Sequence, residues 1–119
     1  MGKLEKVEKY VTNKKEGKLV KLAMDKEEQV RLAAIAGLGK VGKDDGFNLL
    51  ITLIADKDPK LRAASARALG ELGNEHATAH LAYRLEHETD KEVVAAIREA
   101  ITALHKTETY LMVSIQDDC

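Results

Sequence analysis

The sequence has few of the large aromatic residues that small domains commonly bury in a core. It has no tryptophan, and aromatic residues make up only 3% of its 119 residues. A core must therefore be built from Leu, Ile, Val and Ala, which suits closely packed helices. Proline occurs once, and β-branched residues are scattered rather than alternating with polar ones. These features predict a single domain of the all-α class.

Cysteine is nearly absent, since the only one is Cys119, the last residue. One thiol cannot form a disulfide within the chain, which fits a reducing compartment. No apolar run reaches the roughly 18 residues of a membrane-spanning helix, and the N-terminus has no signal-peptide pattern. We therefore expect a cytoplasmic protein with no membrane partner, either a monomer or a weak homodimer.

The sequence also has no large excess of either charge. Nineteen basic residues stand against twenty acidic ones, giving a formal net charge of −1. This balance provides no net field to attract nucleic acid or an anionic membrane. Nucleic acid is therefore not the favoured partner, although a local basic face stays open as an alternative.

What the sequence does contain is an internal repeat of 31 to 32 residues. Three segments can be stacked on one another, namely residues 30–42, 61–73 and 93–105. Apolar residues in each stand at i, i+3, i+7, i+8 and i+11, which is one face of a helix. Small residues recur at two of these positions and let neighbouring helices approach closely. Gly42 and Gly73 follow the last apolar residue, where glycine commonly ends a helix.

Each of these helices is preceded by another apolar-periodic run and a short polar turn. Pro59 follows Asp58 as a first helical residue follows an N-cap. Asp90 is placed similarly, at the start of the second helix of the third unit. Each unit is thus a helical hairpin. Within the single domain 1–119 we expect a capping helix over 3–12, hairpins over about 14–42, 44–73 and 75–105, and an apolar tail over 106–119. The tail either covers the open face of the third hairpin or is an exposed patch for a partner or a second copy of the chain.

The middle unit resembles a known repeat. Residues 58–73 read D-P-K-L-R-A-A-S-A-R-A-L-G-E-L-G and resemble the HEAT-like repeat named after phycobilisome lyases, approximately D-P-x-V-R-x-x-A-x-x-A-L-G-x-[IL]-G. The first unit lacks the Asp-Pro pair, and the third has Val94 in place of the arginine. The resemblance covers about residues 14–105 and implies a short right-handed α-solenoid of about three hairpins. Such repeats serve scaffolds, adaptors, chromophore lyase subunits and nucleic-acid binders alike, so it implies fold more than function.

The resemblance also implies a role for two arginines. In repeats of this type, the arginine after the first apolar residue usually bonds within the array. Arg31 and Arg62 would then form a ladder with turn residues such as Asp25, Asp56 and Asp58. The alternative is that these arginines contact an external partner.

Residues that could carry out chemistry are sparse. His76 and His80 are spaced i, i+4, which is enough for two ligands to one metal, but no set of four ligands is evident. The pair His87-Glu88 resembles those that hold metal in the HEAT-repeat deoxyhypusine hydroxylases, yet those enzymes repeat the pair across units and here it occurs once. No nucleophile arrangement or phosphate-binding loop is visible. We therefore predict a protein that is not an enzyme and needs no metal or other cofactor.

The architecture supports binding better than any motif does. In HEAT arrays the second helix of each hairpin lines the concave face, and its columns outside the core form stripes. That face would be mildly basic with one apolar spot, and its arginines could bind an acidic peptide or phosphate. It has no aromatic residue on which bases could stack. The candidate partner-binding residues are Arg31, Ile35, Arg62, Arg67, Glu71, Val94 and Arg98. The alternative is that these residues form an ordinary solvated face.

Three hypotheses about function follow. The leading one is a noncatalytic protein-interaction scaffold or adaptor, which binds a protein partner of unknown identity on the concave face. The second, implied by the resemblance, is an accessory subunit of a modifying enzyme such as a chromophore lyase. The third is a nucleic-acid-binding module.

Overall fold

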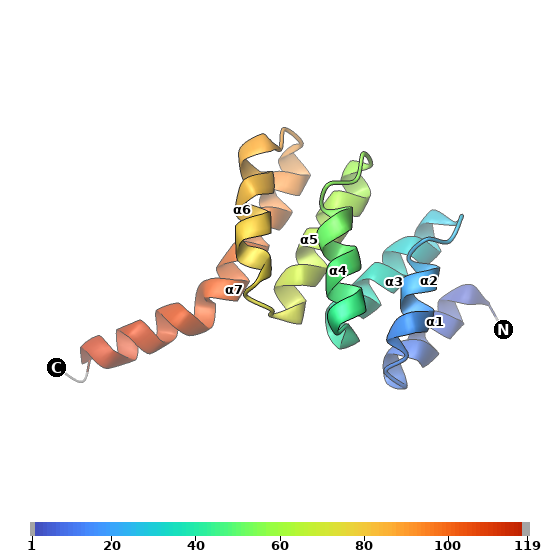
Figure 1. Ribbon diagram of the computed structural model, residues 1–119, viewed down its shortest axis with the longest axis horizontal. Coiled ribbons are helices and arrows are strands. Elements are labelled where there is room, and N and C mark those ends of the chain that lie inside the picture. Colours follow the sequence, from blue (N-terminus) through green and yellow to red (C-terminus); the bar gives the residue numbers. More distant parts are fainter. Residues whose placement is uncertain (1, 118–119) are drawn as a thin grey trace.

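The computed structural model describes residues 2–117, with side chains described for residues 2–105, and over this range the chain forms seven α-helices and no strand. The helices are α1 (Lys3–Thr12), α2 (Glu16–Leu22), α3 (Glu28–Val41), α4 (Asp44–Leu53), α5 (Pro59–Leu72), α6 (Ala77–His87) and α7 (Lys91–Asp117). They lie in two layers, with α2, α4 and α6 in one and α1, α3, α5 and α7 in the other (Figure 1). The three hairpins α2–α3, α4–α5 and α6–α7 stack side by side. The prediction of an all-α solenoid of helical hairpins is therefore confirmed.

The two ends of the array differ. Helix α1 spans the range expected for the capping helix, buries Val7, and packs against α2 and α3. It lies beside α3 in the same way as α3 lies beside α5, and so occupies the position of the second helix of a preceding hairpin (Figure 1). At the other end, α7 continues without a break to Asp117. The prediction that an apolar tail covers the third hairpin concerns side chains of residues 106–119, which lie outside the described set.

The core lies between the two layers and is aliphatic, as the composition predicts. Apart from Ser65 and the nearly covered side chain of Glu88 in a turn, the buried side chains of the described part are Val, Leu, Ile and Ala. The largest side chains that are completely covered come from both layers and include Leu19, Leu50 and Leu81 of the first helices and Leu38, Leu69 and Ile97 of the second helices. Burying each such side chain stabilises the fold by about 1.5–3 kcal/mol.

Second helices of adjacent hairpins approach each other closely at glycine. A Cβ atom added to Gly39 would lie 3.0 Å from the Cα atom of Ala68, and one added to Gly70 would lie 2.8 Å from the Cα atom of Ala100. Because the facing atoms belong to the backbone, they cannot move aside as a flexible side chain would. The repeat pattern predicted that the small residues Ala68 and Ala100 lie where helices approach closely. It did not predict that the residues facing them are Gly39 and Gly70.

Helix starts follow the predicted capping. The side chain of Asp58 accepts a hydrogen bond from the backbone N–H of Lys60 (2.9 Å), and Pro59 occupies the first turn of α5. Asp90 accepts in the same way from the N–H groups of Glu92 (2.9 Å) and Val93 (3.1 Å), which begins α7. Both caps satisfy backbone donors that have no partner within the helix.

The two glycines predicted to end helices act differently. Gly73 adopts a left-handed conformation, with φ of 78°, and its N–H donates to the carbonyl of Leu69. Gly42 also follows the last helical residue, but its backbone is extended, with φ of −65° and ψ of 148°. A Cβ atom there would lie 2.5 Å from the carbonyl oxygen of Leu38, so this site needs glycine for lack of space. The prediction that a glycine ends each helix is therefore confirmed at both positions, although only Gly73 has the left-handed conformation.

Candidate functional site

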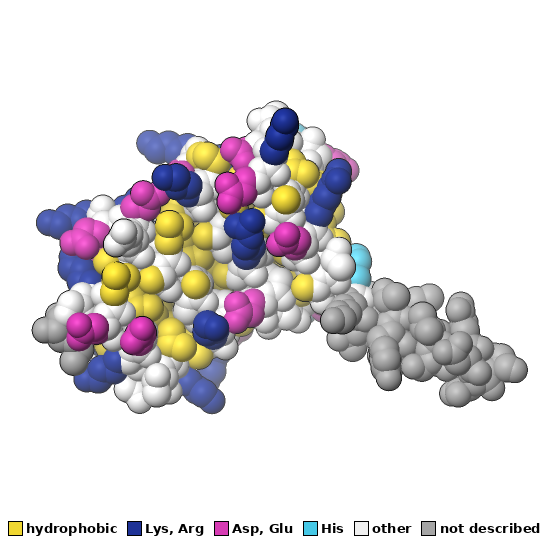
Figure 2. Space-filling model, turned by 180° about the vertical axis from the view of Figure 1, so that it is seen from behind, with side chains coloured by type: hydrophobic (Ala, Val, Ile, Leu, Met, Phe, Trp, Pro, Cys, Tyr) yellow, Lys and Arg dark blue, Asp and Glu magenta, His cyan; other side chains and the backbone are white. Residues whose placement is uncertain are grey.

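The face formed by α3, α5 and α7, called the second-helix face below, has a hollow of about 460 Å³ between its helices. Figure 2 shows this face, where exposed apolar side chains lie among charged ones. The hollow is lined by Leu32, Ala36, Lys60, Ala63, Ala64, Arg67, Ala68, Glu71 and Glu92. Since four of these residues are alanine, the floor is apolar and leaves room for side chains of another molecule.

Ion pairs between adjacent second helices surround the hollow. They are Lys60 with Glu28 (3.2 Å), Lys40 with Glu71 (3.5 Å), and Arg67 with Glu92 (4.0 Å) and Glu99 (3.8 Å). Exposed pairs of this kind each stabilise a protein by less than about 1 kcal/mol, so a binding partner could replace them. Four carboxylates and three cations take part in these pairs, so charges of both signs border the hollow. The expectation of a mildly basic face stays a prediction, since Arg31, Arg62 and Arg98 are not among these groups.

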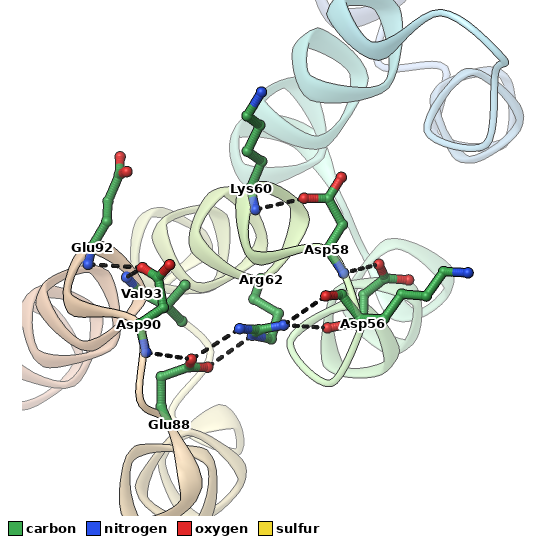
Figure 3. A network of polar contacts seen from close by, with 9 residues as sticks. Asp56, Asp58, Lys60, Arg62, Glu88, Asp90, Glu92 and Val93 are labelled. Atoms are coloured by element: carbon green, nitrogen blue, oxygen red, sulfur yellow. Dashed lines mark hydrogen bonds and ion pairs between the residues drawn. The ribbon is translucent and has the colours of Figure 1, made fainter.

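Arg62 lies at the turns that connect the helices rather than in the hollow (Figure 3). Its Nη1 atom donates to the carbonyl oxygens of Asp56 (2.8 Å) and Lys57 (3.1 Å) in the turn of its own hairpin. Its Nε and Nη2 atoms donate to the two carboxylate oxygens of Glu88, at 2.8 and 2.9 Å. Glu88 begins the turn of the third hairpin and its side chain is only 2% exposed. Arg62 therefore fastens the second hairpin to the third.

The contact changes the protonation equilibria of both partners. The hydrogen bond from Arg62 holds the pKa of Glu88 below its ordinary value of 4.5, while burial opposes this effect. The backbone N–H of Asp90, which donates to the same carboxylate at 3.1 Å, lowers this pKa further. The hydrogen bond with Glu88 in turn raises the pKa of Arg62. Both groups therefore stay charged at neutral pH.

Arg31 repeats half of this arrangement in the first hairpin. Its Nη1 atom donates to the carbonyl oxygens of Asp25 (2.9 Å) and Lys26 (3.0 Å). In the described part of the chain no bond joins Arg31 to Asp56, the turn residue that corresponds to Glu88 and is one methylene shorter. The predicted bonding of both arginines within the array is confirmed. Their partners are main-chain carbonyls and Glu88, however, and not the carboxylates of the turn aspartates.

The first residue of each turn also organises the turn itself. The carboxylate of Asp25 accepts from the N–H of Glu27 (3.0 Å), and Asp56 accepts likewise from Asp58 (2.9 Å). Asp25 additionally pairs with Lys3 of α1 at 3.1 Å. The backbone hydrogen bond, aided by Lys3, lowers the pKa of Asp25. The pair of Lys3 with Asp25 thus joins the capping helix to the turn of the first hairpin. The pair of Arg62 with Glu88 joins the second hairpin to the turn of the third in the same way.

The remaining predicted residues fall at different places. Arg67 and Glu71 are exposed and line the hollow. Ile35 is completely buried, so its placement on the surface is wrong. Helix α3 has a neighbouring helix on each side and the other layer of helices behind it. These contacts bury a wider part of its circumference than the columns of the repeat indicated. Val94 is half-buried at the position equivalent to Arg62, and Arg98 is exposed on α7.

Sequence reasoning missed several residues of the hollow. Leu32, Ala36 and Ala64 form part of its apolar floor, and Lys60 and Glu92 stand at its edge. Lys60 and Glu92 occupy equivalent positions of successive units, so the repeat alignment contained the signal. The stripes that contain the candidate arginines do not include this position.

Possible metal ligands do not converge. Within residues 2–105, no three side chains of the types His, Cys, Asp and Glu lie close enough together to hold a metal ion. His76 and His80 are both exposed. The Nδ1 atom of His87 lies 2.8 Å from the carbonyl oxygen of Tyr83, and the two rings stack with centroids 4.4 Å apart. Among the described helices, none combines the length and apolar character needed to cross a membrane.

Comparison with known protein families gives one finding that agrees with this geometry. Residues 17–102 match the family model described as HEAT repeats, a range that covers most of the chain and includes residues of all three hairpins. No curated protein matches the chain.

Proposed function

The chain belongs to the HEAT-repeat family, and from this premise we propose that it is a noncatalytic scaffold or adaptor that holds a protein partner on its second-helix face. HEAT repeats are commonly protein-interaction scaffolds, and stacked repeats provide extended binding surfaces. The observation that supports the proposal is the hollow of about 460 Å³, which combines an apolar floor with exposed charges of both signs.

The chemistry of the hollow favours an amphipathic helix as the bound segment. Leu32, Ala36 and Ala64 can receive small apolar side chains, as grooves that bind helices commonly do. The edge offers Arg67 to carboxylates of the partner and Glu71 to its lysines or arginines. Since the existing ion pairs at the edge are long and exposed, replacing them requires little free energy.

The proposal assigns new roles to the predicted site residues. Arg67 and Glu71 contact the partner directly, together with Ala36 and Leu32. Arg62 supports the surface indirectly, because its bonds hold two hairpins in a fixed relation.

A photo-crosslinking amino acid placed at residue 36 tests the proposal directly. Ala36 is exposed and lines the hollow, whereas Ala82 is exposed on α6 in the other layer and provides a matched control. We expect position 36 to form a discrete crosslinked product in native extract and position 82 to form none. The partner identified in this way should then bind Ala36→Arg at least about tenfold more weakly than Ala82→Arg. Equal crosslinking at both positions, or equal affinity of both variants, would contradict the proposal.

The middle unit supports a second candidate, an accessory subunit of a modifying enzyme such as a chromophore lyase. Its Asp58 and Pro59 begin a helix, and its Gly73 ends one, at the positions where the phycobilisome-lyase-type repeat has these residues. Absorbance spectra of a tetrapyrrole, recorded with and without the protein and candidate lyase subunits, test this alternative. An unchanged spectrum in every mixture would exclude the lyase version.

A further inference from the structure

The near-neutral net charge of the chain conceals an uneven distribution. Residues 1–26 carry eight lysines and four acidic residues, whereas residues 27–119 carry eleven basic and sixteen acidic ones. Figure 2 shows Lys and Arg side chains gathered around the end of the molecule where α1 and α2 lie. Helices α1 and α2 therefore form a positive end on a molecule that is otherwise acidic.

Four of these lysines form one continuous surface, called the lysine surface below. Lys14, Lys15, Lys18 and Lys21 are exposed and line a shallow hollow of about 470 Å³ at the start of the first hairpin. In the part of the chain whose side chains are described, none of these four ammonium groups forms an ion pair or a hydrogen bond. Other lysines do, since Lys3, Lys40 and Lys60 each pair with a carboxylate.

The one carboxylate within the lysine surface is engaged elsewhere. An oxygen of Glu16 accepts hydrogen bonds from the backbone N–H groups of Lys43 and Gly46 (2.8 Å for Gly46) at the start of α4. The positive end of the α4 dipole offsets part of its charge. Glu16 thus holds two hairpins together, and the neighbouring lysines are left without a local counter-charge.

The backbone provides a separate observation. Lys14 has a left-handed conformation, with φ of 54°, and is the only residue other than glycine with positive φ in the described chain. It follows the end of α1, where the N–H of Lys15 donates to the carbonyl of Tyr10 at 2.8 Å. Glycine or asparagine is usual at this position because a Cβ atom disfavours the left-handed conformation. Because the ammonium group of Lys14 has no partner in the fold, packing does not explain why lysine stands here.

We propose that the lysine surface is a second binding site, which takes a short acidic segment of a protein partner rich in Asp and Glu. Lysine is a flexible point charge and suits carboxylates that are not held in one geometry. The acidic remainder of the chain repels a long polyanion such as duplex nucleic acid, but it does not reach a short segment bound at one end. This site lies on the first hairpin and is independent of the hollow between α3 and α5.

Fluorescence anisotropy with a labelled poly-glutamate peptide of about ten residues tests the proposal at low salt. The full chain should bind this peptide, and added salt should release it. Reversing two charges in Lys18→Glu/Lys21→Glu should weaken binding by about tenfold or more. The control Lys57→Glu/Lys91→Glu makes the same change in net charge at exposed lysines outside the surface and should alter affinity less than about twofold.

Three results would overturn the proposal. They are no binding of the peptide at low salt, equal losses in both double variants, and tighter binding of duplex DNA or phosphatidylserine vesicles than of the peptide. Circular dichroism of each variant shows whether the helical fold is intact. Failure here would leave the crosslinking result at Ala36 unaffected, because the two sites share no residue.

A single substitution separates binding from stability. Lys14→Gly removes both the cation and the unfavourable backbone conformation. We expect its melting temperature to rise while its affinity for the peptide falls by about two- to threefold. An affinity equal to that of the unchanged chain would show that Lys14 does not belong to the site.

Discussion

Arg62 and Glu88 form a bidentate ion pair between the second and third hairpins, with N–O distances of 2.8 and 2.9 Å. The remaining nitrogen of the guanidinium group binds the carbonyl oxygens of Asp56 and Lys57 (Figure 3). One side chain therefore joins the turns of two successive hairpins. A planar guanidinium group can make these four bonds together, which the ammonium group of lysine cannot do in the same geometry.

Removing this side chain should destabilise the protein more than removing its counterpart in the first hairpin. Arg62→Met leaves the nearly buried carboxylate of Glu88 without its partner and should lower the free energy of unfolding by about 3 kcal/mol. Arg31→Met loses only hydrogen bonds to two carbonyls and should lower it by about 1 kcal/mol. Urea unfolding followed by circular dichroism measures both. Equal losses would mean that the bond to Glu88 adds no stability.

Stability should fall in acid because the pKa of Glu88 is lower in the folded than in the unfolded chain. Such a carboxyl contributes its full stabilisation above its unfolded value, and the contribution is lost as pH falls through the folded value. The loss begins near the ordinary value of 4.5 and continues below it. In Glu88→Gln the urea midpoint should change less over this acid range. Glu86→Gln, an exposed residue of α6, should retain the original dependence. Parallel curves for all three proteins would contradict this assignment.

Two glycine-to-alanine substitutions should have opposite effects. At Gly70 the new Cβ atom would lie 2.8 Å from the Cα atom of Ala100, so α5 and α7 must separate and stability should fall by about 2 kcal/mol. At Gly17, within α2, no atom lies within 4 Å of the new Cβ atom. Alanine favours the helical conformation there and should raise stability by about 0.5–1 kcal/mol. Thermal unfolding of the two variants checks the signs, and a stabilised Gly70→Ala would show that the helices are free to move apart.

Ser65 offers a substitution that should stabilise the core. Its side chain is completely buried, and its hydroxyl oxygen has no hydrogen-bond partner among the described residues. Replacing it with alanine removes an unsatisfied polar group and should raise the free energy of unfolding by about 1 kcal/mol. In Thr52 the hydroxyl is exposed and donates to the carbonyl of Asn48, so Thr52→Ala should change stability by less than about 0.5 kcal/mol. A destabilised Ser65→Ala would imply a partner for the hydroxyl.

The sequence predicted the fold well because its signals are local and recur. The capping of α5 by Asp58 and the end of that helix at Gly73 depend only on neighbouring residues, and both predictions are correct. Burial of Ile35 depends on how two helices pack on either side of a third, which the helical period alone does not reveal. The contact of Gly70 with the next hairpin is a property of the same packing.

The site was harder to predict for a related reason. The repeat shows that Arg62 occupies an equivalent position to Arg31, but it does not show where a long side chain points. The sequence also does not indicate that Glu88 pairs with Arg62, because an ion pair across 26 residues leaves no trace in a single sequence. Arg67 is exposed and lines the hollow, and its contact with a partner stays a prediction.

The contact between successive second helices bears on how an array of this kind can grow by duplication. The position held by Gly39 and Gly70 is held in the third hairpin by Thr102, and that of buried Ile35 is held by Arg98. A fourth hairpin copied from the second and joined behind α7 would meet both side chains at the closest point of the interface. Thr102→Gly and Arg98→Ala would have to accompany such an insertion. At this spacing these two side chains would hinder the stacking of a further hairpin, and they are the first to change in an engineered longer array.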